Sequence, residues 1–260
     1  TEALQSHIDA WVGEPINITS LELAVEAIST LYRRDGWLAK VELPSQDLTD
    51  GLVHLRVIEA VLSGVAVQTA PKAAVTSDIP HDFVVHATPL NEPLSLKNLE
   101  RASQLINELP GVDSTLSLRP GDIPGQTEAV ISIGDAKPHE GSVMMDNGGS
   151  RSTGNLRLTG QATLKGLWQR GDLTSIQWSK SHGLNSTRLS YSEPLGASGL
   201  RGGVFASVGK YEVELESSAA SSSATAHGPT ASIGLEVMYP WLRSATSSIN
   251  WTASLEKKKF

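Results

Sequence analysis

The chain has 260 residues, a formal net charge of −7 and no cysteine. The length allows two or three domains, and the lack of cysteine excludes disulfides and thiolate metal sites. The negative charge argues against nucleic acid or an anionic membrane surface as the main partner, and no apolar run approaches the roughly 20 residues of a membrane-spanning helix.

Two similar phrases predict the starts of two amphipathic helices. Residues 14–22 read EPINITSLE, and residues 92–100 read EPLSLKNLE. Asn17 and Ser95 are typical N-cap residues, because the side-chain oxygen can accept a free backbone N–H of the first helical turn. Apolar residues then recur at helical spacing until a glycine-containing stop. The repetition indicates a duplicated unit.

Alternating segments around these helices predict strands. Two strands follow each helix, and a short strand and a weak helix precede the second one. The expected strands are 37–43, 51–60, 63–68, 112–118 and 127–133, and the weak helix covers 79–87. The order is strand, helix, helix, strand, strand, which can bury one small core beneath a helix-covered sheet.

The first copy lacks its leading strand, because the sequence opens at TEALQSHIDAW, which already has a helical pattern. We therefore expect the sequence to begin inside a domain. The predicted domains are 1–60, 61–138 and 139–260. The first two are α+β units of one kind.

Residues 139–260 have a different pattern, in which six or seven segments alternate strictly between apolar and polar side chains. In 155–166 and 173–180, one side of the pattern carries Arg157, Gln161, Lys165 and Gln177, and the other is apolar. A soluble antiparallel sandwich and a transmembrane barrel both have this alternation. Three observations favour the barrel. Tilted strands of about 12 residues span roughly 28 Å, close to the apolar band of an outer membrane; the opposite face is polar; and aromatic residues lie near strand ends.

The chain resembles the outer-membrane transporters of two-partner secretion, of the haemolysin-activator type, which carry two POTRA domains before a barrel. The stretches that carry the resemblance cover essentially the whole chain. They are LYRRDGWLAKVELPSQDLTDGLVHLRVIEA (31–60), PLSLKNLERASQLINELPGV (93–112), LRPGDIPGQTEAVISI (118–133), DNGGSRSTGNLRLTGQATL (146–164) and LSYSEPLG (189–196). The fold class that the resemblance implies is two α+β POTRA domains followed by an antiparallel transmembrane β-barrel, here only partial.

The resemblance also implies a function. The chain would belong to a translocation pore in the bacterial outer membrane, with POTRA domains in the periplasm that capture a large unfolded secreted protein. The partners would be that exoprotein and outer-membrane lipid, with no nucleic acid and no small-molecule substrate. The plug helix, the inward-folded loop and the remaining strands of the family are absent, so we expect a piece of a longer transporter.

Candidate site residues lie in both halves. An exposed POTRA sheet edge could accept an extended client as an additional strand. The client-binding candidates are Tyr32, Gln46, Leu99, Arg101, Leu105 and Ile106, together with the strand at 127–133. The pore-lining candidates are Arg157, Gln161, Lys165 and Gln177. Each also has a plain structural interpretation: core packing for the leucines, isoleucine and tyrosine, loop capping for Gln46, and a solvated surface for the charged residues.

No catalytic, cofactor or metal motif is found. The seven histidines form no metal-binding spacing, and neither a nucleophile elbow nor a phosphate-binding glycine loop occurs. The prediction is therefore a non-enzyme without cofactor. The alternatives are a barrel-assembly factor of the same superfamily, an outer-membrane barrel enzyme and a soluble β-sandwich binding module.

Overall fold

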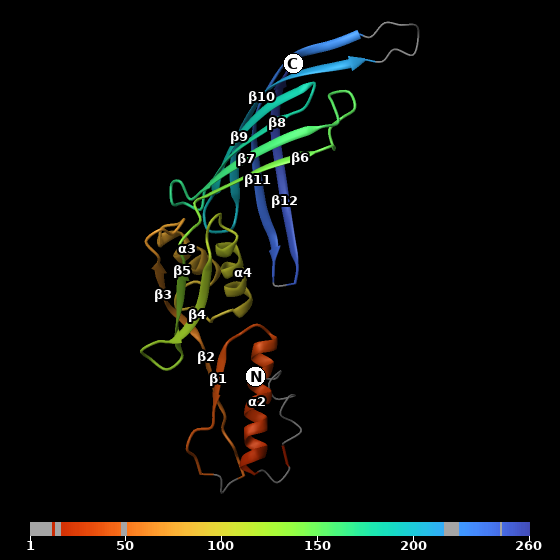
Figure 1. Ribbon diagram of the computed structural model, residues 1–260. Coiled ribbons are helices and arrows are strands. Elements are labelled where there is room, and N and C mark those ends of the chain that lie inside the picture. The colour runs from red at the N-terminus through yellow and green to blue at the C-terminus, as the bar shows by residue number, and fades with distance from the viewer. Residues whose placement is uncertain (1–11, 14–16, 48–50, 216–223, 245) are drawn as a thin grey trace. The chain divides into compact units, whose positions relative to one another are not determined.

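The computed structural model describes all residues except 1–11, 14–16, 48–50, 216–223 and 245 (Figure 1). The chain divides into two compact units. The N-terminal unit takes the described residues up to Gln68, with His81–Gln104 and Thr115–Ser132, and the C-terminal unit takes Thr69–Pro80, Leu105–Ser114 and Ile133–Phe260. The division runs through the second α+β region, so the domain boundaries stay a prediction.

The first module consists of one helix and two strands. Helix α2 (Ile18–Arg34) is capped by Asn17, whose side chain accepts a hydrogen bond of 2.8 Å from the backbone N–H of Ser20. The helix buries a stripe of apolar residues at helical spacing. Strands β1 (Ala39–Glu42) and β2 (Arg56–Glu59) pair antiparallel and are shorter than predicted. The helix predicted at the start of the sequence lies outside the described residues.

The second module has the predicted order of elements. It comprises β3 (Val61–Thr69), α3 (Asp78–Ala87), α4 (Leu96–Asn107), β4 (Ser114–Pro120) and β5 (Gln126–Ile133). The sheet order is β3-β5-β4, so β5 lies in the middle. Side chains from strands and helices are completely buried, among them Leu62, Val84 and Ile131. Among the described residues, no helix combines the length and apolarity that crossing a membrane requires.

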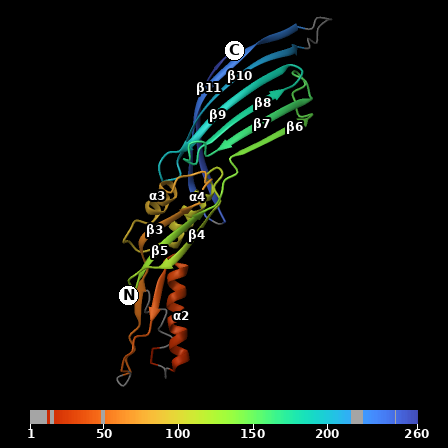
Figure 2. The same ribbon diagram turned by 60° about the vertical axis from the view of Figure 1, so that its left-hand side comes forward.

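Seven strands form one curved sheet in the C-terminal unit (Figures 1 and 2). They are β6 (His139–Asp146), β7 (Arg157–Lys165), β8 (Leu173–Lys180), β9 (Leu184–Pro194), β10 (Arg201–Leu215), β11 (Ala224–Arg243) and β12 (Ser248–Lys259). Each strand pairs antiparallel with the next along the chain. The sheet is not closed, because neither β6 nor β12 has an outer partner within the described ranges.

The register separates the side chains of this sheet into an apolar face and a polar face. Ala162 lies opposite Ile176, and Ile176 opposite Leu189, so the apolar side chains form rows across the strands. These rows are open: Val143 is 78% exposed and Leu255 is 75% exposed. A sandwich would bury them beneath a second sheet. No second sheet covers them in the part of the chain that is described, so the structure does not favour the sandwich alternative.

Candidate functional sites: a groove and a polar sheet face

A groove of about 670 Å³ opens in the N-terminal unit. One wall is formed by β1 and β2, and the other by β4, β5 and the connection between these two strands. Backbone hydrogen bonds fix both walls, since the N–H of Ala60 donates to the carbonyl of Leu38 at 2.8 Å and that of Val61 to the carbonyl of Gly125 at 2.9 Å. The groove therefore has a defined backbone frame.

Strands with one open edge flank this groove. Among the described residues, β1 pairs with β2 alone and β4 pairs with β5 alone, so each leaves a row of backbone groups free for another strand. Strand β5 (predicted as 127–133) has partners on both sides. A client cannot extend the sheet at β5, so client contact with this strand stays a prediction, and the outer strands of the sheet are β3 and β4.

Apolar and charged side chains both line the groove, and the apolar ones include Leu38, Ile58, Leu118 and Ile123. Ile123, in the β4–β5 connection, lines the groove and is 60% exposed. Lys40 and Glu42 form an ion pair at 2.7 Å, and a hydrogen bond from Lys40 lowers the pKa of the Glu42 carboxyl below its usual value. These features fit an extended segment that places one apolar side chain against the isoleucine.

The four predicted client-binding residues of the second module lie mostly inside the protein. Leu99, Leu105 and Ile106 are buried, which matches their interpretation as core residues, and Arg101 is half-buried. Helix periodicity places Arg101, two residues after Leu99, on a different side of the helix from that leucine. None of the four lines the groove. Their contact with a client stays a prediction.

The two candidates of the first module hold local structure. The Tyr32 hydroxyl donates to Glu59 at 3.2 Å, and burial raises the pKa of this phenol, aided by the neighbouring carboxylate. The Gln46 amide donates to the carbonyl of His54 at 2.8 Å and accepts from its N–H at 2.7 Å, which closes the connection between β1 and β2. Neither residue lines the groove.

The pore-lining candidates share the polar face of the seven-stranded sheet. Gln161 lies directly opposite Gln177 in the β7–β8 register. Arg157 pairs with Asp146 at 3.2 Å and Lys165 with Glu140 at 2.8 Å, so both ion pairs join β6 to β7. That these residues line a water-filled conduit stays a prediction.

Hydroxyl groups occupy the middle of this polar face. Ser175 and Ser190 approach to 2.6 Å across β8 and β9, and Ser207 and Ser232 to 2.7 Å across β10 and β11. In each pair one hydroxyl donates to the other, which leaves one O–H of the pair free of this contact. The polar face between the charged residues therefore consists of short, polar side chains.

The sequence reasoning missed an aromatic residue on the polar face. Phe205 is buried and lies against Gly234, where a Cβ atom would come within 2.3 Å of the phenyl ring. The guanidinium carbon of Arg188 lies 3.7 Å from the centre of the ring, which is a cation–π contact. The signal was present, because Phe205 has the same alternation phase as Ser207 and the opposite phase to Val204.

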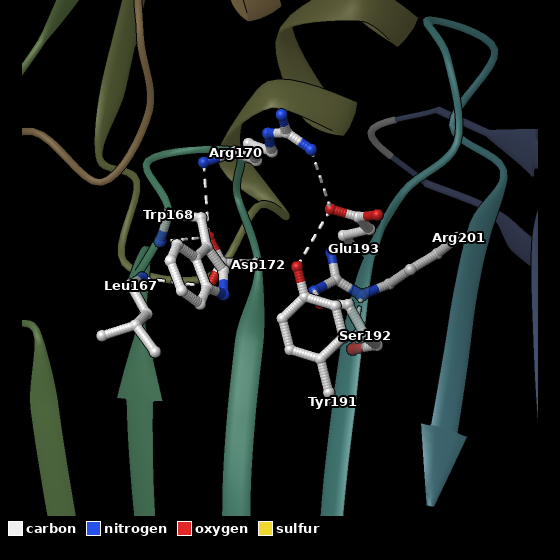
Figure 3. Close-up of polar contacts among 8 residues, drawn as sticks. All are labelled: Leu167, Trp168, Arg170, Asp172, Tyr191, Ser192, Glu193 and Arg201. Atoms are coloured by element: carbon white, nitrogen blue, oxygen red, sulfur yellow. Dashed lines mark hydrogen bonds and ion pairs between the residues drawn. The ribbon is translucent and has the colours of Figure 1, made fainter.

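A polar cluster fixes the turns at one end of the sheet (Figure 3). The carboxylate of Asp172, completely buried, accepts backbone N–H groups from Leu167 and Trp168 at 3.0 Å and from Arg170 at 3.3 Å. The guanidinium of Arg201 donates to the carbonyl of Gly171 at 3.0 Å. Sequence pattern alone did not indicate this cluster, since a lone aspartate in a turn is common.

Arg201 also joins two strands of the same cluster. Its guanidinium donates to the side chain and the carbonyl of Ser192, each at 3.0 Å. Beside it, the Tyr191 hydroxyl donates to Glu193 at 2.9 Å (Figure 3). No group of three metal-binding side chains occurs in the described ranges.

Comparison with known proteins gives two family matches. Residues 125–260 match the family described as haemolysin secretion/activation protein ShlB/FhaC/HecB, and residues 1–60 match the POTRA domain of ShlB type.

Curated relatives are similar over much of the chain. The heme/hemopexin transporter protein HuxB of Haemophilus influenzae (strain Rd) is 25% identical over 94% of this chain and 43% of its own length. The outer membrane transporter CdiB of Escherichia coli is 30% identical over 58% of this chain and 25% of its own length. The chain thus spans less than half the length of these relatives.

Solved structures show the same fold. CdiB from Escherichia coli superposes with a TM-score of 0.75 at 21% identity, covering 99% of this chain and 48% of that one. BamA from Haemophilus ducreyi superposes with a TM-score of 0.52 at 15% identity, over 99% of this chain and 49% of that one. The predicted fold class is therefore confirmed: a POTRA-type domain precedes a sheet that matches part of a barrel and is not closed.

Proposed function

Because the chain belongs to the haemolysin secretion/activation (ShlB/FhaC/HecB) family, we propose that it is part of an outer-membrane pore that exports a secreted partner protein. The observation that carries this proposal is the division of the seven-stranded sheet into a polar and an apolar face. In a closed barrel the apolar face would meet lipid and the polar face would border water. Strands from outside this sequence would have to pair with β6 and β12 to close it.

The α+β modules would be periplasmic and would receive the client. An unfolded polypeptide presents extended segments, and an open strand edge binds these through backbone hydrogen bonds that depend little on sequence. The groove beside β4 adds Ile123 as an apolar contact. The likeness to BamA is one of fold alone, so a role in assembling other barrels has no separate support. We assign no reaction and no cofactor.

The test uses the full-length transporter expressed with the secreted partner from the same gene cluster. A photo-crosslinking residue at Ile123 is expected to capture the client, and Ile123→Asp is expected to reduce the secreted amount about tenfold, since it removes an apolar contact and adds a charge. The matched control is Ile18, another isoleucine, 77% exposed, which does not line the groove.

Secretion by Ile18→Asp should equal that of the parent protein. Equal secretion by Ile123→Asp, with no crosslink at this position, would remove the groove from the client path. A transporter that exports no partner protein at all would overturn the proposed function itself.

A further inference from the structure

The lysines of the apolar face are gathered at one end of the sheet. By strand alternation, four lysines share a face with Trp178 and Leu255, and they lie in the halves of β8, β10 and β12 that are remote from the turn at 166–172. They are Lys180, Lys210, Lys257 and Lys259. The opposite end of this face carries aromatic residues and no lysine in the described strands, with Tyr191, Tyr239 and Trp251 among them.

Two of these lysines flank an asparagine on the intervening strand. Lys180 lies opposite Asn185, and Asn185 lies opposite Lys210, so the three residues form one row across β8, β9 and β10. Strands lie about 4.8 Å apart, which places the two lysine backbones about 10 Å apart. Two flexible side chains at this separation can converge on one anion above the asparagine.

The orientation of the asparagine amide is fixed by a neighbour. The indole N–H of Trp178 donates to the Asn185 side-chain oxygen at 2.9 Å, so the amide oxygen faces the indole. The amide NH₂ group is left as a donor toward solvent. The row thus offers two ammonium groups and one amide, all exposed, and neither ammonium is paired with a carboxylate among the described residues.

We propose that Lys180, Asn185 and Lys210 bind the phosphate group of an outer-leaflet lipid. These donors border one open hollow of about 660 Å³, which His182 and His227 also line. Directly below them on the same face lie Trp178 and Val208, which suit acyl chains. A ligand with an anionic head and an apolar body matches both parts, whereas a soluble anion would gain nothing from the apolar surface.

The net charge of −7 does not oppose this site, because the lysines are concentrated locally. One carboxylate, that of Glu212, also lines the hollow, two residues beyond Lys210 on the same face of β10, so the two lysines outnumber it there. The inference rests on the proposed function, since it places this end of the sheet in the outer leaflet.

The experiment measures lipid retained by the full-length transporter after purification in detergent, by native mass spectrometry with added bisphosphoryl lipid A. The variant Lys180→Gln/Lys210→Gln is expected to retain about tenfold less lipid than the parent, because two charge-assisted contacts are lost. The control is Lys258→Gln, a lysine at the same end of β12 on the polar face, and it should retain the parental amount.

A second variant guards against a folding defect. Asn185→Asp can still accept the Trp178 indole N–H, but it replaces the amide donor with a negative charge, so retention should fall while the heat-dependent mobility shift of the folded barrel persists. Inorganic phosphate is added in a separate arm and should not displace the lipid at equal concentration.

Parental retention by both variants, or displacement by inorganic phosphate, would overturn the lipid site while leaving export untouched. Unchanged secretion alongside reduced retention is the expected pattern. Absence of the protein from the outer-membrane fraction would instead overturn the proposed function, and the lipid site with it.

Discussion

Asp172 is completely buried, yet backbone N–H groups of its own turn surround its carboxylate. The sequence alone does not identify which side chain organises this turn. The reason is physical: the three donors are brought together by the folded turn and not by residue type. Tyr32, in contrast, is a candidate from the sequence, and the structure adds that its hydroxyl donates to Glu59 of β2.

Asp172→Asn is expected to destabilise the sheet by about 1–3 kcal/mol. The new amide NH₂ group is a donor, so a backbone N–H that faces it would lose its hydrogen-bond acceptor. The measurement is urea unfolding of the full-length protein in lipid vesicles, followed by tryptophan fluorescence. Glu193→Gln is the control, since its ion pair with Arg170 is long, at 3.9 Å, and the glutamine oxygen can still accept from the Tyr191 hydroxyl, so stability should change little. Equal stability of Asp172→Asn and the parent would contradict the argument.

A pH effect follows from the raised pKa of Tyr32. The unfolded chain loses this proton more readily than the folded one, so the contribution of Tyr32 to stability is complete below pH 10, the ordinary tyrosine pKa, and is lost as the pH rises through the higher folded value. Above pH 10, the free energy of unfolding should therefore fall more steeply with pH for the parent than for Tyr32→Phe. Parallel curves would rule out the effect.

At the scale of elements, strand existence was more predictable than strand extent. Strand β11 runs from Ala224 to Arg243, because pairing with β10 carries it through Gly228 and Pro229 and pairing with β12 carries it on to Arg243. Glycine and proline are depleted in strands, so the alternating pattern alone does not predict this full length. The position of β5 in the middle of its sheet was missed for a related reason. Alternation identifies a strand, whereas the strands with which it pairs depend on the path of the connections between them.

Gly234→Ala should weaken the β10–β11–β12 region by about 1–3 kcal/mol, because the added methyl group would meet the ring of Phe205 at 2.3 Å and the carbonyl oxygen of Leu255 at 2.7 Å. Gly141→Ala is the matched control, since its nearest neighbour would lie at an ordinary 3.6 Å. Denaturant unfolding of the vesicle-bound proteins compares the two. A loss in Gly141→Ala as large as in Gly234→Ala would refute the packing explanation.

At the scale of the whole molecule, the two-faced pattern and the resemblance together predicted the fold, while the client contacts were less predictable. The residues chosen in α4 are apolar and periodic, which is also the pattern of a core, and the structure buries Leu99, Leu105 and Ile106. The groove was not foreseen, because it needs β1 and the β4–β5 connection, which are distant in sequence, to face each other.

The polar face can be tested with neighbouring residues, because these 260 residues contain no cysteine. Gln161→Cys and Ala162→Cys point to opposite faces of β7. In intact outer membranes, a charged thiol reagent should label Gln161→Cys at least about tenfold faster, since thiols in lipid do not meet water and stay protonated. Faster labelling of Ala162→Cys would reverse the assignment of faces.

The serine pairs on the polar face have a consequence for whatever passes along it. In each pair one hydroxyl donates to the other, so only one of the two O–H groups is left for a passing polypeptide, and such short side chains would hold it weakly. Transit along such a wall would be nearly indifferent to the cargo's amino-acid order, and selectivity would fall to the recognition step that comes before it.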